Sequence, residues 1–362
     1  MKERLWTNLI AALRHGQCIL MLGPEIPATA QNNASGATLI GGLKGKLRRE
    51  MEDDNRQVYG NTLAAVAQQY EDAYESNSLQ STAEGFYRSC QYGPSTVHDR
   101  LASLPFSLIV TTAQDDLLRQ ALANAKKEPL VHHFNLRGDK IANPEFMIPG
   151  SPTQPVVYHL FGEASDPPSL VLSENDLLDF LIAVVSERSS LPNSLLSALK
   201  RKGQSFLFLG FGVRHWDLRI LSKLLLRALD QSHSTSIAAE PVRNLLPQPD
   251  REEMVLFYQR GTRVEVEDTD IGEFLSEVLR RLEAEGGYAG QVAPLGLRPR
   301  VFTSYAREDA HLAQRLFAAL QKEYFDPWLD SQSLGGGEDW DKRIRQDLAT
   351  SHFTVVLYSK AF

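Results

Sequence analysis

Short apolar runs alternate with amphipathic segments along most of this chain. Trp6, Leu9, Ile10 and Leu13 recur at helical spacing, and Gly16 ends that pattern before the continuous apolar run 18–22. We therefore expect a helix followed by a buried strand. The same reasoning predicts strands at 106–112, 156–162, 205–210 and 263–266, helices at 173–185, 216–229 and 271–283, a mostly helical stretch over 37–92, and a loop-rich stretch over 124–155.

Strands that alternate with helices favour a parallel sheet covered by helices on both faces. The expected fold is therefore α/β, a Rossmann-like doubly wound parallel sheet. Such sheets bind ligands at the carboxyl ends of their strands. Gly23-Pro24-Glu25 follows the first predicted strand, and Gly210-Phe211-Gly212 follows the strand at 205–210.

A break in the pattern separates a second, smaller domain. Residues 284–299 contain four glycines and two prolines, which is typical of a linker. We expect domains at 1–283 and 300–362 on either side of it. The second domain is predicted to contain strands at 301–305, 325–329 and 353–358, helices at 310–322 and 340–349, and a glycine-rich loop at 335–337.

Composition narrows the classes of protein that the chain can belong to. Hydrophobic residues make up 43% and charged residues 23%, as in ordinary globular proteins. The net charge of −7 and the absence of a basic block disfavour direct binding of nucleic acid. Cys18 and Cys90 are the only cysteines, so a zinc or disulfide scaffold is excluded and a reducing compartment is indicated. No apolar run approaches 18 residues, so we expect a cytoplasmic protein without a membrane span.

The second domain carries a group of motifs in a specific order. They are the stretch from Val301 to Asp309 (VFTSYARED), Trp328-Leu329-Asp330, Leu334 to Trp340, and Val355 to Ser359. Together they resemble the Toll/interleukin receptor (TIR) domain of prokaryotic defence proteins, a flavodoxin-like parallel α/β domain. Such a domain normally has further strands. The resemblance therefore implies either a truncated domain or a sheet that another chain completes.

The first domain resembles a divergent bacterial sirtuin-like domain over about residues 1–283. The resemblance is carried by Leu20 to Gly23, Ile109 to Thr112 with Asp115 and Asp116, Tyr158 to Gly162, Ser169 to Leu172, and Phe206 to Phe211 with Trp216 and Asp217. Sirtuin-like and TIR-like domains both break the bond between nicotinamide and ribose in NAD. That reaction needs a group that stabilises a cationic sugar, donors for the diphosphate and an aromatic wall.

The resemblance implies NAD-binding residues in the first domain, namely Gly23, Thr112, Asp115, His159 and Gly210. Several residues of this chain differ from those of active family members. Pro24 removes a backbone donor from the glycine turn, Ala113 stands where active members have Asn, and Phe161 stands where they have His. His159 lies two residues earlier on the same face of the strand. We therefore expect this domain to be a binding or assembly module without catalytic activity.

Each of these residues also has a structural interpretation. His159 suits a strand end where the ring bonds to backbone, and Asp115 suits a helix N-terminus. Gly23 and Gly210 suit ordinary sharp turns.

In the TIR-like domain, the position of the family's catalytic Glu falls between Trp340 and Lys342, where no Glu is present. Asp341 and Glu338 are the candidate catalytic carboxylates, with Asp339 beside them. Their alternative role is to stabilise the start of a helix. The resemblance places Arg307 on the nucleotide and Trp328 as a stacking ring. An ion pair with a neighbouring carboxylate and a place in the core are the alternatives for these two residues.

Two resemblances to NAD-consuming families predict a prokaryotic defence or signalling protein that acts on or senses NAD. The expected reaction, where there is one, is NAD hydrolysis without a metal. NAD or a related nucleotide and further copies of the chain are the expected partners, with no membrane. The alternative is a non-catalytic nucleotide-binding and oligomerisation scaffold. A third hypothesis makes 1–283 the NAD-consuming part, with His159 and Asp115 in altered roles.

Overall fold

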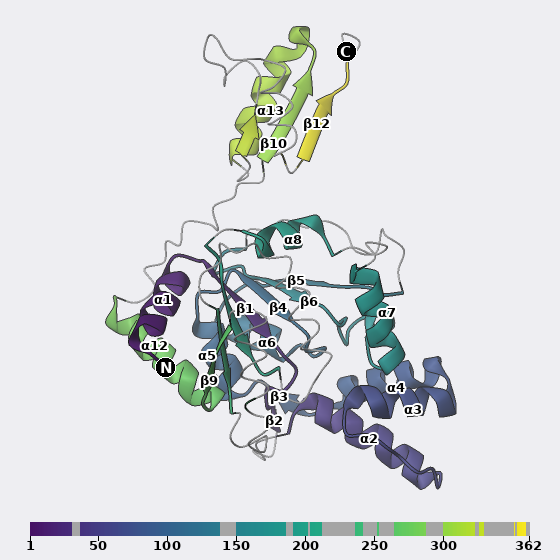
Figure 1. The fold of residues 1–362 in the computed structure, drawn as a ribbon. Coiled ribbons are helices and arrows are strands. Elements are labelled where there is room, and N and C mark those ends of the chain that lie inside the picture. Colours follow the sequence, from purple (N-terminus) through teal and green to yellow (C-terminus); the bar gives the residue numbers. More distant parts are fainter. Residues whose placement is uncertain are drawn as a thin grey trace. The chain divides into compact units, whose positions relative to one another are not determined.

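The structure of the chain, a computed structural model, forms two compact units, Met1–Ala293 and Pro294–Phe362 (Figure 1). Each unit is described separately below. The described residues are 1–30, 37–137, 150–185, 191–201, 203–211, 236–241, 252, 264–286, 300–322, 326–328, 351 and 353–359.

A seven-stranded parallel sheet organises the first unit, in the order β5-β6-β4-β1-β7-β8-β9. The strands are β1 (Cys18–Leu22), β4 (Leu108–Thr111), β5 (Leu130–His133), β6 (Val156–His159), β7 (Ser205–Leu209), β8 (Ser236–Glu240) and β9 (Val264–Asp268). All neighbouring strands of this sheet run parallel. This confirms the Rossmann-like, doubly wound fold.

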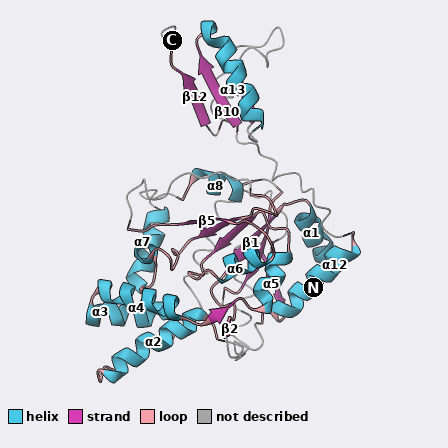
Figure 2. Cartoon of the chain, turned by 180° about the vertical axis from the view of Figure 1, so that it is seen from behind, coloured by secondary structure: helices cyan, strands magenta, loops and turns pink. Residues whose placement is uncertain are grey.

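Helices cover both faces of this sheet (Figure 2). One face packs against α1 (Glu3–Arg14), α5 (Thr96–Ser103), α6 (Leu117–Asn124) and α12 (Ile271–Ala284). The other packs against α7 (Glu174–Val185) and α8 (Asn193–Leu199). Continuous apolar strands are therefore stable here, because neither face of the sheet is left to water.

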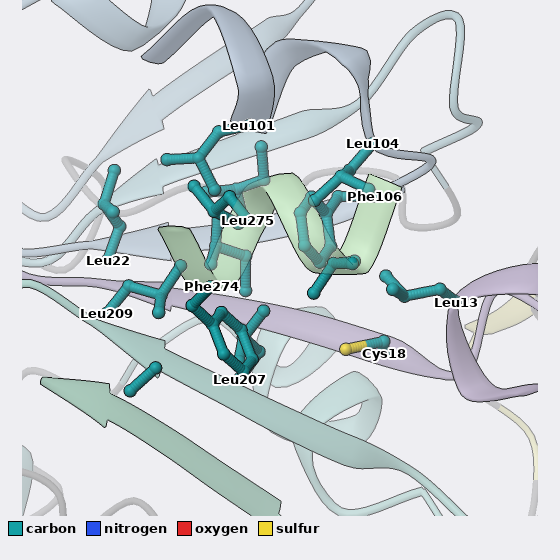
Figure 3. Close-up of a cluster of buried hydrophobic side chains, with 14 of the residues drawn as sticks. Leu13, Cys18, Leu22, Leu101, Leu104, Phe106, Leu207, Leu209, Phe274 and Leu275 are labelled. Atoms are coloured by element: carbon teal, nitrogen blue, oxygen red, sulfur yellow. The ribbon is translucent and has the colours of Figure 1, made fainter. Parts of the chain in front are cut away.

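The two faces use alternate residues of the same strand. Ile19 and Met21 of β1 belong to the core under α7 and α8, whereas Leu20 and Leu22 belong to the opposite core. The second of these cores is drawn in Figure 3, where Leu207 and Leu209 of β7 lie with Phe274 and Leu275 of α12. A period of two along each strand thus fills both layers.

A helical layer forms a third core away from the sheet (Figure 1). It contains α2 (Leu39–Asp53), α3 (Leu63–Tyr74) and α4 (Ser76–Ser89). Thr38 and Thr62 cap the first two helices, since their hydroxyls accept hydrogen bonds from the N–H groups of Gly41 and Ala65. The predicted helical stretch over 37–92 is thereby confirmed. Beside it, β2 (Thr29–Ala30) and β3 (Tyr92–Gly93) form a small antiparallel pair.

Two strands of the sheet were not predicted. The prediction of a loop-rich stretch over 124–155 is wrong at Leu130–His133, because β5 is a short, partly exposed edge strand that lacks an apolar run. Ser236–Glu240 is fully buried as β8, although its small and polar residues give no strand signal. The helix predicted at 216–229 lies outside the described residues.

The second unit contains a three-stranded parallel sheet in the order β11-β10-β12. Its elements are β10 (Arg300–Tyr305), the 3-10 helix η3 (Arg307–Asp309), α13 (Ala310–Lys322), β11 (Asp326–Trp328) and β12 (Phe353–Leu357). This is the second α/β arrangement that the sequence predicts. The glycine-rich loop at 335–337, the helix predicted at 340–349 and most of the predicted linker, 287–299, lie outside the described residues.

Candidate functional site

The candidate site of the first unit lies at the carboxyl ends of its central strands. β1 pairs with β4 on one side and with β7, which comes later in the chain, on the other side. The order of strands along the chain therefore reverses its direction across the sheet at β1. Such a reversal marks the place where open α/β sheets bind ligands. Five predicted residues gather at this edge. Gly23, Thr112 and Gly210 directly follow their strands, His159 ends β6, and Asp115 lies in the turn between β4 and α6.

Gly23 and Gly210 pack backbone against backbone. A Cβ atom on Gly23 would lie 2.1 Å from the Gly210 carbonyl oxygen, and one on Gly210 would lie 2.5 Å from Cδ1 of Ile26. Gly210 also has a φ of +69°, a conformation that favours glycine. The loop after β1 therefore lies directly on the end of β7, and both glycines have a structural reason to be there.

The backbone donors of this loop are engaged within the fold. The Gly23 N–H donates to the Leu209 carbonyl at 2.8 Å, and the Glu25 N–H donates to the Gly210 carbonyl at 2.9 Å. Pro24 between them has no N–H. In this conformation none of these three residues has a backbone donor left for a phosphate.

His159 ends β6 and is buried, with 3% of its surface exposed. Its Nδ1 lies 2.7 Å from the Ala113 carbonyl oxygen, which fixes Nδ1 as the protonated nitrogen. Burial lowers the pKa of His159, although the Ala113 carbonyl and Glu163 oppose this effect. The ring is therefore a neutral imidazole with an unprotonated Nε2. Its backbone contact is the one that the structural interpretation expected.

Asp115 begins the turn that leads into α6. Its Oδ1 accepts a hydrogen bond from the Leu117 N–H at 3.1 Å. Burial and, to a smaller extent, the neighbouring Asp116 raise the pKa of Asp115 to about 6, although the backbone hydrogen bonds oppose the shift. The carboxyl group is therefore present in both protonation states near neutral pH, which suits contact with an amide or hydroxyl group.

A small cavity brings some of these residues together. Its lining includes Gly23, Asp115 and His159, together with Leu22, Pro24, Ile26, His98, Thr111, Ala113 and Leu118. The cavity volume of about 10 Å³ leaves room for about one water molecule. Thr112 and Gly210 do not line it. The Thr112 hydroxyl is buried and lacks a hydrogen-bond partner within the described part of the chain.

Two buried polar residues at this edge were missed by the sequence analysis. The Gln114 amide donates to the carbonyls of Phe161, at 3.1 Å, and Val171, at 2.7 Å. The Glu240 carboxyl group at the end of β8 accepts a hydrogen bond from the Phe211 N–H at 2.8 Å. An acidic residue that ends a short stretch of small residues was the only sequence signal for Glu240.

A histidine flanked by two carboxylates lies next to His159. His133 is the register partner of His159 on β5, and its Nε2 lies 2.9 Å from Asp166 Oδ2. Its Nδ1 lies 3.8 Å from a carboxylate oxygen of Glu163. This contact fixes the loop after β6 to the edge strand. No group of three or more His, Cys, Asp or Glu side chains suited to a metal ion occurs among the described residues.

The candidate residues of the second unit are placed only in part. Arg307 begins η3 after β10, and Trp328 ends β11 as the register partner of Phe302. The structure does not describe the side chains of Arg307 and Trp328. Glu338 and Asp341 lie outside the described residues. Within the described chain, no helix combines the length and the apolar character that crossing a bilayer takes.

The sheet order and its helical layers define the first unit as a Rossmann-like α/β domain. Comparison with protein families is more specific. The model of the SIR2-like domain matches residues 107–266, and the model of the TIR domain matches residues 301–362. The chain therefore carries a SIR2-like domain followed by a TIR domain, as both resemblances predict. No curated protein matches the chain.

Proposed function

We propose that this chain is a prokaryotic defence or signalling protein that acts on or senses NAD. The observation that carries the proposal is the presence of a SIR2-like and a TIR domain in one chain, because both resemblances imply the same substrate. We place NAD sensing in the SIR2-like domain and hydrolysis in the TIR domain. The proposed setting is the cytoplasm, with several copies of the chain assembled.

The proposed reaction breaks the bond between C1′ of the ribose and the nicotinamide nitrogen. The bonding electrons leave with nicotinamide, a water oxygen attacks C1′, and one proton of that water is released, which gives ADP-ribose. Asp341 or Glu338 would stabilise the cationic sugar. Arg307 would bind the diphosphate and Trp328 would stack on a ring.

The geometry of the SIR2-like site supports a sensing role. Asp115 and the neutral His159 line one cavity and offer a carboxyl group and a ring nitrogen to a carboxamide. The cavity holds about one water molecule, so a dinucleotide enters only when the segment that contains Ile26 moves away from Gly210. Occupancy would thereby change the conformation of the loop after β1, as a sensor requires.

The test is nicotinamide release from NAD by the full chain at micromolar concentration. We expect release by the native chain and its loss in the double variant Glu338→Ala with Asp341→Ala. Asp339→Ala is the matched control, because it removes a carboxylate between the two positions. Release that persists in the double variant and disappears in Asp115→Ala would instead place the chemistry in the SIR2-like domain.

A second candidate function is a non-catalytic nucleotide-binding and oligomerisation scaffold. It is favoured by Ala113 and Phe161, which stand where active members of the family have Asn and His. On this hypothesis no variant and no concentration of the native chain releases nicotinamide. NAD would still bind, as isothermal titration calorimetry would detect, and sedimentation velocity would detect assembly of the chain.

A further inference from the structure

The carboxyl end of β7 holds a buried acid in a place where such sheets usually hold part of a ligand. Glu240 is 6% exposed, and its Oε1 lies 2.8 Å from the backbone nitrogen of Phe211, which donates to it. Phe211 directly follows the left-handed Gly210. Backbone N–H groups after a glycine at a strand end are common donors to phosphate oxygens. Glu240 therefore takes up a donor that a diphosphate would use.

The surroundings of Glu240 are unfavourable to a second negative charge. Glu25 faces it from the loop after β1, and Asp268 is its register partner on β9. Burial, together with Glu25, raises the pKa of Glu240 to about 8, although hydrogen bonds from the Phe211 and Gly210 backbone oppose the shift. At neutral pH most molecules thus hold Glu240 as the neutral acid.

We propose that Glu240 is a built-in occupant of the donors at the end of β7, so that an anionic ligand binds this edge only when Glu240 is uncharged or withdrawn. The inference rests on the proposed function, since it assigns a regulation to the nucleotide site of the SIR2-like domain. The ligand chemistry concerned is a phosphate or diphosphate group. A neutral Glu240 accepts a weaker hydrogen bond from the Phe211 N–H, so a phosphate oxygen can displace it, whereas an ionised Glu240 holds this donor more strongly and repels the anion.

The test measures binding of inorganic pyrophosphate and of NAD to the full chain by calorimetry at pH 7 and pH 9. If only the form with a neutral Glu240 binds, a pKa of about 8 makes the affinity about tenfold weaker at pH 9. Glu240→Gln should keep the acceptor for Phe211, remove the charge and abolish this difference for NAD, whose own charge is the same at both pH values. Pyrophosphate loses a proton in this range, so its pH dependence is compared between the native chain and the variant. Nicotinamide, which carries no negative charge, should bind equally at both pH values.

Two further variants separate this effect from a general loss of structure. Glu25→Gln leaves the Phe211 bond intact and removes the facing charge, so the fall in anion affinity should begin at a lower pH. Asp176→Asn is the matched control, because Asp176 is another buried carboxylate that accepts backbone hydrogen bonds, from Leu172 at 2.9 Å and Ser173 at 3.2 Å. It should leave the pH dependence of anion binding unchanged.

Thermal unfolding without ligand tests the titration of Glu240 independently of any binding. The unfolded chain ionises Glu240 near pH 4.5, well below the folded chain, so Glu240 destabilises the fold as pH rises from 4.5 to 8. Glu240→Gln should remove this loss of stability.

The two ligands separate failure of the inference from failure of the proposed function. Pyrophosphate affinity whose pH dependence changes in Glu240→Gln, without any binding of NAD, would contradict only the proposed function. An unchanged pH dependence of pyrophosphate affinity in Glu240→Gln would overturn the inference.

Discussion

The α-carbon of Gly23 faces the Gly210 carbonyl oxygen so closely that an added methyl group would lie 2.1 Å from it. This contact joins the loop after β1 to the end of β7. It explains why glycine is needed at position 23 even though the donors of that loop bond within the fold. The shape of the candidate site and the stability of the unit therefore depend on the same contact.

Gly23→Ala should destabilise the chain by at least about 2 kcal/mol, because the obstructing atoms are backbone and cannot rotate away. Urea unfolding followed by circular dichroism measures the change. Gly85→Ala is the control, since a Cβ there meets nothing within 4 Å in the middle of α4. That control should stabilise the chain by about 0.5–1 kcal/mol. Equal effects of the two substitutions would contradict the contact.

Gln114→Ala should cost about 2–4 kcal/mol of unfolding free energy. The substitution removes the Gln114 hydrogen bond to the buried Val171 carbonyl and one of the two hydrogen bonds to the Phe161 carbonyl, which keeps the Val171 N–H. Gln120→Ala, which removes an amide from the partly exposed side of α6, should change stability by less than about 0.5 kcal/mol. A Gln114→Ala effect as small as that of Gln120→Ala would show that the bridge contributes little.

His98 should make the fold less stable in mild acid. Burial lowers the pKa of His98 to about 4, while the unfolded chain takes up the proton near pH 6.5. Stability is therefore lost as pH falls from 6.5 toward 4, by about 2 kcal/mol at pH 5. His98→Gln keeps an acceptor for the Ser95 N–H at the start of α5 and should remove most of this loss. Unfolding at pH 7 and pH 5 measures it, with the exposed His15→Gln as control.

Asp115 should act in the opposite direction over a similar pH range. Its folded pKa of about 6 lies above the unfolded value of 3.8, so ionisation weakens the fold as pH rises between these values. Asp115→Asn should raise the melting temperature at pH 7 more than at pH 4. Asp72→Asn, which removes an exposed carboxylate on α3, should give no such difference. If Asp115→Asn changes the melting temperature equally at both pH values, the burial of this carboxyl group is contradicted.

Most strands could be predicted because they are short apolar runs whose burial on both faces leaves a local signal. Cys18–Leu22 and Ser205–Leu209 were found in this way and pair with each other in the sheet. The two strands that were missed lack this signal. Leu130–His133 lies at the edge of the sheet, and Ser236–Glu240 is buried by its neighbours despite small and polar residues.

By itself, the sequence determined the alternation of strands and helices, the two domain families and the residues that follow the central strands. Only the tertiary structure decided what those residues contact. Gly23 meets Gly210, His159 bonds to Ala113, and Glu240 bonds to Phe211. These pairs come from segments far apart in the chain. Periodicity reports which face of an element is buried, whereas the partner of each donor depends on the order of strands in the sheet.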